Sequence, residues 1–215
     1  MVTQETATQL YLISPEDFQL RIFAAELEKV LATGCVSVFQ LRLKGKSDQD
    51  IIVAAQQLQA LCRDHQVSFI LNDRVDLAAK IHADGVHLGA EDGAGKEGAV
   101  ADAKKKLGKD AIVGVSCYDS KDLAMQAAED GADYVSFGAF YASPTKQSKG
   151  KPTLDLLKFW STYTIIPCVA IGGITKDNIG EVSQAGADFA AVISCVWNNP
   201  LGPVDAIKTL YQAIS

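Results

Sequence analysis

An amide and two cations alternate where one apolar segment of the sequence ends. The stretch from Gln40 to Lys44 follows the β-rich run 35–41, and a period of two places Gln40, Arg42 and Lys44 on the same side of the chain. The planar fork of arginine and the compact charge of lysine both suit phosphate oxygens. This pattern predicts an anion site for a phosphorylated small molecule, with a solvated basic strand end as the alternative.

Carboxylates follow the next two apolar runs. Asn72 and Asp73 come after the run 67–71, and Glu91 and Asp92 come after the run 85–88. Mg²⁺ takes one or two carboxylates and completes its coordination with substrate phosphate and water. We therefore expect carboxylates from these two strand ends to share Mg²⁺, although Asp73 also fits the N-cap of the helix that follows it.

Hydroxyl groups and lysines follow the fifth and sixth runs. Ser116 ends the run 111–116, where a helix cap would explain it equally well. The stretch 138–151 is the longest polar insertion of the chain, and it suits either a lid that closes over an anion or an exposed loop. It contains the hydroxyl groups of Ser143, Thr145 and Ser148 and at least three lysines, among them Lys146.

The last two runs end in residues typical of a phosphate-binding backbone. Gly172 and Gly173 follow the seventh run, and Ile193 and Ser194 follow the eighth. Glycine allows close approach of the chain, and backbone N–H groups at such ends commonly bind phosphate. The sequence thus predicts a second anion site, and with it group transfer between two phosphorylated molecules.

Eight β-rich runs alternate with helical patterns and must position these residues. The predicted strands are 9–13, 35–41, 67–71, 85–88, 111–116, 133–138, 167–171 and 188–194. They are almost continuously apolar, as expected of parallel strands buried on both faces, and Ala-Asp pairs at 83–84, 132–133 and 187–188 enter three of them. Units of ~27 residues predict a (β/α)₈ barrel formed by the single domain 1–215, in which reactive groups gather at the carboxyl ends of the strands. A doubly wound open sheet is the alternative, but no G-x-G-x-x-G follows the first strand.

Composition restricts the partners and the compartment. A formal charge of -6 disfavours nucleic acid and anionic membranes, so we expect small-molecule phosphorylated substrates. The N-terminus does not resemble a secretory signal, and the apolar run 189–197 is about half of the ~20 residues that a membrane span needs, which predicts a cytoplasmic protein.

The 5 cysteines contain no C-x-x-C and are expected to be reduced and mostly buried. Helix faces rich in Ala and Leu suit either a homodimer interface or packing on the barrel.

In their order and approximate spacing, these segments resemble the thiamine phosphate synthase family. The resemblance extends over nearly the whole chain. The segments that carry it are 40–44, 71–73, 85–89 with Asp92, 114–116, 131–135, Thr145 with Lys146, 170–174 and 193–194.

The resemblance implies a reaction and a role for each matching residue. A hydroxymethylpyrimidine pyrophosphate condenses with a thiazole phosphate to give thiamine phosphate and pyrophosphate, and the bond to pyrophosphate breaks first. By position, Asp73 and Asp92 would bind Mg²⁺; Arg42, Lys44, Asn72 and Lys146 the pyrophosphate; Gln40 and Ser116 the pyrimidine; and Ser143, Thr145, Gly172, Ile193 and Ser194 the thiazole phosphate. Arg42, Lys44, Ser116 and Lys146 are the expected catalytic residues.

Three departures from the family pattern leave two other functions open. The stretch 141–144 replaces the usual Phe-Pro-Thr, Ala90 replaces a glutamine, and no histidine follows Ser116 closely. A barrel that binds the phosphates without catalysis would explain the altered 141–144 segment. A related thiazole tautomerase is the other alternative, but it is thought to use the histidine that is missing here. His87 is expected to be a hydrogen-bonded interior residue.

Overall fold

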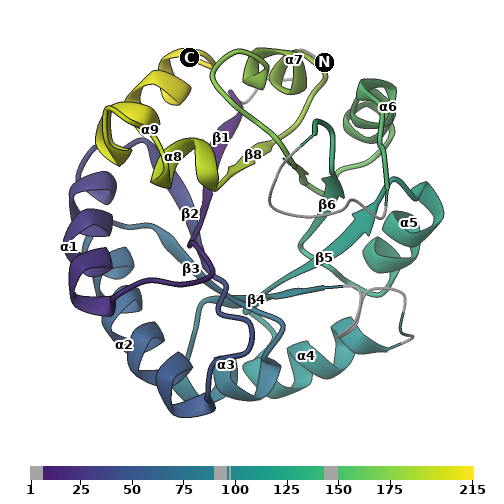
Figure 1. Ribbon diagram of the computed structural model, residues 1–215. Helices are drawn as coiled ribbons and strands as arrows, with labels where there is room; N and C mark the ends of the chain where they lie inside the picture. The colour runs from purple at the N-terminus through teal and green to yellow at the C-terminus, as the bar shows by residue number, and fades with distance from the viewer. Residues whose placement is uncertain (1–6, 90–95, 97, 143–149) are drawn as a thin grey trace.

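The chain forms a closed barrel of parallel strands surrounded by helices. In this computed structural model, residues 7–89, 96, 98–142 and 150–215 are described. Within them each strand pairs with the next in sequence order, and β8 pairs with β1 to close the ring (Figure 1). The predicted (β/α)₈ barrel is confirmed.

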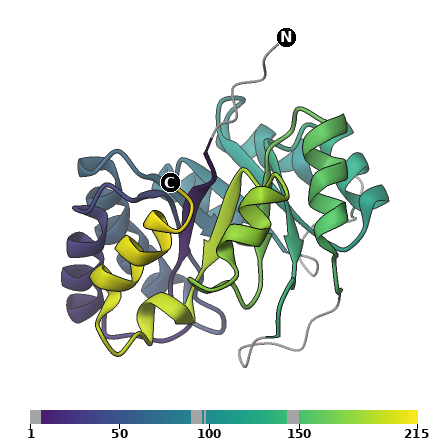
Figure 2. The same ribbon diagram turned by 90° about the horizontal axis from the view of Figure 1, so that it is seen from above.

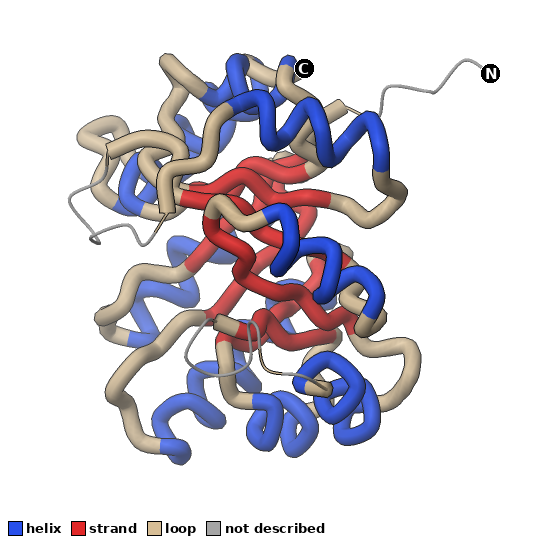
Figure 3. The backbone as a smooth tube through the Cα atoms, turned by 90° about the vertical axis from the view of Figure 1, so that its right-hand side faces the viewer, coloured by secondary structure: helices blue, strands red, loops and turns tan. Residues whose placement is uncertain are grey.

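The observed elements follow the predicted alternation. The strands are β1 (Gln9–Ile13), β2 (Val36–Leu41), β3 (Ser68–Asn72), β4 (Gly85–Leu88), β5 (Ile112–Tyr118), β6 (Tyr134–Gly138), β7 (Cys168–Ile171) and β8 (Phe189–Val192). The helices are α1 (Leu20–Leu31), α2 (Asp48–Asp64), α3 (Val75–Ile81), α4 (Ala99–Leu107), α5 (Lys121–Glu129), α6 (Leu154–Tyr163), α7 (Ile179–Gln184), α8 (Ser194–Trp197) and α9 (Pro203–Gln212). Figures 2 and 3 show the helices on the outside of the strands.

Two strand ends differ from the prediction by two residues each, and both do so for local reasons. β5 continues to Tyr118 because a register shift after Ser116 inserts an extra residue into its pairing with β6. β8 stops at Val192, because the backbone turns at Ile193 (φ -135, ψ -90) into the short helix α8. Apolar composition alone did not reveal either change of backbone direction.

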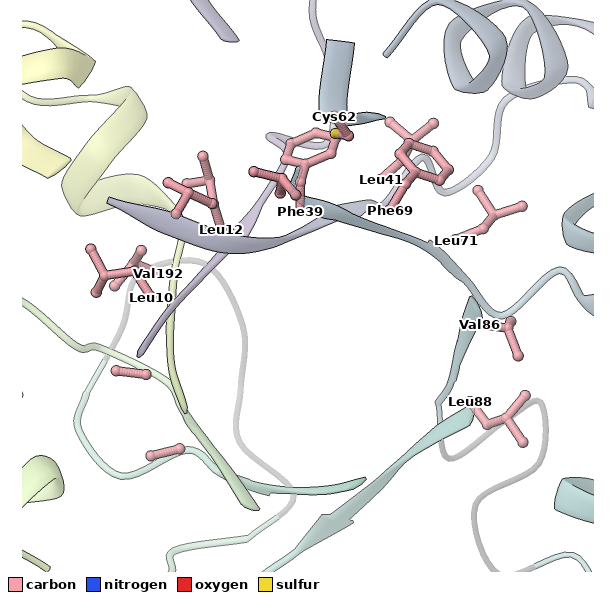
Figure 4. Packing of buried hydrophobic residues seen from close by; sticks show 14 of the residues in the cluster. Leu10, Leu12, Phe39, Leu41, Cys62, Phe69, Leu71, Val86, Leu88 and Val192 are labelled. Carbon is pink, nitrogen blue, oxygen red and sulfur yellow. The ribbon is translucent and has the colours of Figure 1, made fainter. Parts of the chain in front are cut away.

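Alternation along each strand divides the core into two parts. Leu10, Leu12, Phe39 and Leu41 belong to the large cluster packed between strands and helices, and Figure 4 shows such side chains directed away from the centre of the ring. The residues between them face the interior, where Tyr11 belongs to a second, smaller cluster. The interior is therefore filled by side chains, as in other barrels of this type.

The Ala-Asp pairs noted in the sequence tie neighbouring strands together. The carboxylate of Asp84 accepts a hydrogen bond from Phe69 N–H at 2.8 Å, and that of Asp133 accepts one from Val113 N–H at 2.7 Å. The carboxylate of Asp188 accepts one from Cys168 N–H, at the start of β7, at 2.7 Å. Each aspartate satisfies a backbone donor near the start of the preceding strand, which explains the repeat structurally.

Two expectations from composition can be compared with the structure. The 5 cysteines are free thiols, and 3 of them are buried. Of the helices in the described ranges, none has the length and apolar character needed to cross a membrane.

Candidate active site

The carboxyl ends of β1 and β2 are tied together around Arg42. The backbone N–H of Arg42 donates to Ser14 Oγ at 2.9 Å, and Ser14 N–H donates to the carbonyl of Gln40 at 2.9 Å. The guanidinium of Arg42 forms an ion pair with Glu16 in the loop after β1. Gln40 is buried, with 3% of its surface exposed, and it faces the barrel interior. Arg42 therefore stands at the barrel mouth in a fixed position.

Asp73 occupies a strained turn directly after β3. Its φ of 65 lies in the left-handed region, which non-glycine residues rarely adopt and which is often found at functional sites. One carboxylate oxygen accepts a hydrogen bond from Gly89 N–H at 2.9 Å, while the other accepts from Asn72 and lies 3.6 Å from Lys44 Nζ. The structure thus brings Lys44, Asn72 and Asp73 together, as predicted.

The sequence also allowed Asp73 and Ser116 to be helix N-caps, and neither of them is one in the structure. The N-cap of α3 is Arg74, and the Asp73 carboxylate instead bonds across to the end of β4. The cap of α5 is Ser120, whose hydroxyl accepts from Leu123 N–H, so Ser116 is left for other contacts.

A chain of hydrogen bonds crosses the barrel interior beneath these residues. Gln40 Nε2 donates to the Tyr11 hydroxyl, which bonds to the Tyr134 hydroxyl; each distance is 2.9 Å. The Tyr134 hydroxyl also bonds to His87 Nδ1, and His87 Nε2 bonds to Ser116 Oγ, again at 2.9 Å each. We call these five residues the interior chain. It links Gln40 and Ser116, the two residues that the family resemblance assigns to the pyrimidine.

Burial keeps the ionisable members of the interior chain neutral. It raises the pKa of the Tyr11 and Tyr134 hydroxyls well above the ordinary value. It also lowers the pKa of His87 to about 4; the Asp73 charge opposes this shift and the Arg42 charge adds to it. His87 has the hydrogen-bonded interior position expected from the sequence.

Sequence reasoning missed Tyr11, Tyr134, Ser14 and Glu16. The signal for the tyrosines was present, because Leu10 and Leu12 flank Tyr11 and the strand alternation turns the residue between them inward. The ring of Tyr134 fits in the interior only because residue 114 is a glycine. A Cβ on Gly114 would lie 1.9 Å from that ring.

Acid should destabilise the protein through His87. An exposed histidine has a pKa of 6.5, and His87 has a pKa of about 4 in the fold. Between these pH values the unfolded chain therefore binds a proton that the folded chain does not. Stability is therefore lost as the pH falls from 6.5 to 4, by about 3 kcal/mol in total. Denaturant unfolding at pH 7 and pH 4 measures this loss. The wild type should lose about that much more than His87→Gln, and equal losses in the two proteins would contradict the prediction.

The ends of β6 and β7 approach each other closely at two glycines. Gly172 (φ 103) lies so near Ala139 that a Cβ on the glycine would be 2.2 Å from the alanine Cβ. At Gly173 (φ 63), a Cβ would be 2.6 Å from the Ala142 carbonyl oxygen. Tyr141 N–H donates to the Gly172 carbonyl at 3.0 Å, which holds the start of the predicted lid against this turn.

Tyr141, part of the segment that departs from the family pattern, has a defined place. Its hydroxyl donates to Glu181 Oε2 at 2.8 Å, so it anchors the β6 loop to α7. Asn178 Nδ2 donates to the Gly173 carbonyl at 3.0 Å and supports the same turn from the other side.

Ile193 and Ser194 lie where the chain leaves β8 and enters α8. β8 pairs with both β1 and β7, which places this turn next to the glycine turn. The indole N–H of Trp197 donates to the Ile13 carbonyl at 2.7 Å and fixes α8 to the end of β1. Gly172, Ile193 and Ser194 therefore belong to one side of the barrel mouth, as predicted.

Four predicted site residues lie outside the described residues, and their predictions stay open. They are Asp92, Ser143, Thr145 and Lys146. In the ranges that the structure does describe, no three His, Cys, Asp or Glu side chains form a metal-binding group. Asp73 is the described member of the predicted Mg²⁺ pair.

This layout is that of a barrel enzyme acting at the carboxyl ends of its strands, where cationic, acidic and glycine-rich segments meet. Residues 10–196 match the family model described as thiamine monophosphate synthase, so the chain belongs to the thiamine monophosphate synthase family. The family prediction, and with it the prediction of an enzyme, is confirmed.

Individual relatives agree with this assignment. The thiamine-phosphate synthase of Erythrobacter litoralis (strain HTCC2594) is 49% identical over 203 residues, covering 92% of each chain. That of Rhodospirillum centenum (strain ATCC 51521 / SW) is 48% identical over 202 residues, covering 94% of this chain and 95% of the other. The solved thiamine phosphate pyrophosphorylase from Pyrococcus furiosus superimposes with a TM-score of 0.81 at 31% identity, covering 99% of this chain and 98% of that one.

Proposed function

We propose that this protein is a thiamine phosphate synthase. It would join a hydroxymethylpyrimidine pyrophosphate to a thiazole phosphate and release pyrophosphate. The observation that carries the proposal is the cluster of Lys44, Asn72 and Asp73 at one end of the barrel, next to Arg42 because β2 pairs with β3. This cluster lies in a chain that is 49% identical to a relative of that name.

The cations of the cluster suit a leaving pyrophosphate. As the bond between the pyrimidine methylene carbon and oxygen breaks, negative charge grows on the departing group. Arg42 and Lys44 both lie at the barrel mouth, where they would stabilise this charge. Asn72 would donate a further hydrogen bond, and Lys146 would join from the 138–151 segment.

The residues present fit Mg²⁺. Asp73 offers a carboxylate whose side chain is 11% exposed, and it lies among groups that would hold phosphate oxygens. Asp73 and Asp92 would hold the ion, which would supply positive charge to the pyrophosphate oxygens when bound. Lys44 would give up its contact with Asp73 and turn to the pyrophosphate.

The remaining residues would place the two organic substrates. Gln40 and Ser116 would hold the pyrimidine at the ends of the interior chain, and the turns at Gly172 and at Ile193–Ser194 would take the thiazole phosphate through backbone N–H groups. Ser143 and Thr145 would add hydroxyl groups to the same phosphate. The thiazole nitrogen would then meet the cationic carbon as pyrophosphate departs.

The test supplies both phosphorylated precursors and Mg²⁺ to the purified protein. We expect thiamine phosphate and pyrophosphate in equal amounts, no product when either precursor is left out, and loss of product when a chelator removes the metal. Folded protein that forms no product would reject the proposal. If product binds without turnover, the barrel is a non-catalytic binding protein.

The tautomerase alternative finds less support in the site. Both ring nitrogens of His87 are bonded to protein groups, and the other two histidines, His65 and His82, lie at the far ends of helices α2 and α3. A proton shuttle needs a ring nitrogen that can reach the substrate. The tautomerase would exchange a proton on a carboxylated thiazole phosphate without any pyrimidine pyrophosphate, and this assay separates it from the synthase.

The proposed reaction also suggests the setting of the protein. Its substrates are small phosphorylated molecules, and the net charge of -6 does not favour nucleic acid or an anionic membrane as partners. We propose the cytoplasm as its compartment and leave a homodimer as an assembly for size-exclusion chromatography to test.

A further inference from the structure

We propose that the interior chain is a directional hydrogen-bond chain that makes Ser116 a donor and Gln40 an acceptor toward the substrate ring. Tyr11, Tyr134 and His87 are then positioning residues that set the specificity of the site. This inference rests on the proposed function and deepens it.

The members of the interior chain come from strands that do not all neighbour each other. In order along the chain, Gln40 is on β2, Tyr11 on β1, Tyr134 on β6, His87 on β4 and Ser116 on β5. β7 and β8 separate β1 from β6 in the ring, so the bond between their tyrosines crosses part of the interior. A displacement at one end can therefore reach the other end without passing through the backbone ladder.

The direction of the hydrogen bonds follows from what each group can donate. The Gln40 amide nitrogen is a donor only, so the Tyr11 oxygen accepts from it. Among the described residues Tyr134 is the other hydrogen-bond partner of the Tyr11 hydroxyl, so the buried Tyr11 proton goes to Tyr134. The Tyr134 proton then goes to His87 Nδ1, which must carry no proton of its own.

The same reasoning fixes the far end. With Nδ1 unprotonated, the neutral ring carries its proton on Nε2 and donates it to Ser116 Oγ. The hydroxyl proton of Ser116 is then left for another acceptor. At the opposite end one N–H of the Gln40 amide donates to Tyr11, which fixes the orientation of the amide and presents its carbonyl oxygen as the acceptor.

This polarity distinguishes one class of pyrimidine from another. A 4-aminopyrimidine has an amino donor and unprotonated ring nitrogens, which match a carbonyl acceptor and a hydroxyl donor. In a 4-oxopyrimidine a carbonyl acceptor replaces the amino donor, and a ring N–H donor replaces an unprotonated ring nitrogen. The predetermined polarity should reject the 4-oxo ring, because each mismatch leaves a polar group of the site unpaired.

The decisive experiment reads the tautomer of His87 directly. The probe is the ¹⁵N spectrum of protein labelled on histidine, with His87 assigned by its loss in His87→Gln. We expect the wild-type ring to be protonated at Nε2 and bare at Nδ1. Tyr134→Phe removes the donor to Nδ1, and we expect a large part of the His87 population to move its proton to Nδ1. Tyr163→Phe, at an exposed position on α6, is the matched control and should leave the spectrum unchanged.

A kinetic readout accompanies the spectrum. Tyr134→Phe should lower the preference for the 4-amino over the 4-oxo substrate about tenfold, whereas a purely structural role would lower both rates alike.

An Nδ1-protonated His87 in the wild type, or an unchanged tautomer in folded Tyr134→Phe, would overturn the inference. Because the spectrum needs no substrate, an inactive protein with the expected tautomer rejects the proposed function and leaves the interior chain standing. If Tyr134→Phe does not fold, the wild-type tautomer decides alone.

Discussion

Asp73→Asn should lower kcat for thiamine phosphate formation about 1,000-fold while leaving the fold intact. The amide keeps an oxygen for the Gly89 N–H and has nearly the same shape, so the turn after β3 can persist. It loses the negative charge that would attract Mg²⁺ and that now faces Lys44, and it loses the oxygen that accepts from Asn72. Steady-state rates over a range of Mg²⁺ concentrations measure the effect, and excess metal should restore only part of the rate.

Asp76→Asn is the matched control for this substitution. Asp76 lies three residues further along, in the first turn of α3, where it is exposed and pairs with Arg74. Removing its charge should change kcat by less than about twofold, because an exposed ion pair contributes little and lies outside the site. Equal rates for Asp73→Asn and the wild type would refute the assignment of Asp73 to the metal.

Gly172→Ala should affect both stability and thiazole phosphate use. At φ 103 an alanine is strained, and its Cβ would lie 2.2 Å from the Cβ of Ala139. The segment 139–142 must then move away from the end of β7, and with it the start of the predicted lid. We expect the free energy of unfolding to fall by about 3 kcal/mol. A displacement of about 1 Å at the phosphate turn should lower kcat/KM for the thiazole phosphate about 100-fold.

A second glycine separates backbone strain from close approach. Gly131 also has a positive φ, of 91, but a Cβ there would meet nothing within 4 Å. Gly131→Ala should therefore cost about 1 kcal/mol of stability and leave kcat/KM unchanged. Similar kinetics for the two variants would show that the contact between the β6 and β7 loops has no part in binding.

Much of the site could be predicted from local pattern. The alternation of β-rich and helical segments determines a parallel barrel, and in a parallel barrel all strand ends of one kind lie at the same end of the molecule. That rule was sufficient to bring Arg42, Lys44, Asn72 and Asp73 together, although 31 residues separate the first from the last. It was also sufficient to place Gly172 beside Ile193 and Ser194.

The sequence by itself therefore determined the fold and the residues at the barrel mouth, because both follow from periodicity and from the direction of the strands. Only the tertiary structure decided which side chains meet inside the barrel. Tyr11 and Tyr134 are 123 positions apart, and their contact depends on strand register and on the space left by Gly114. Hydrogen bonds across an interior depend on distances of a few tenths of an ångström, which no pattern along the chain encodes.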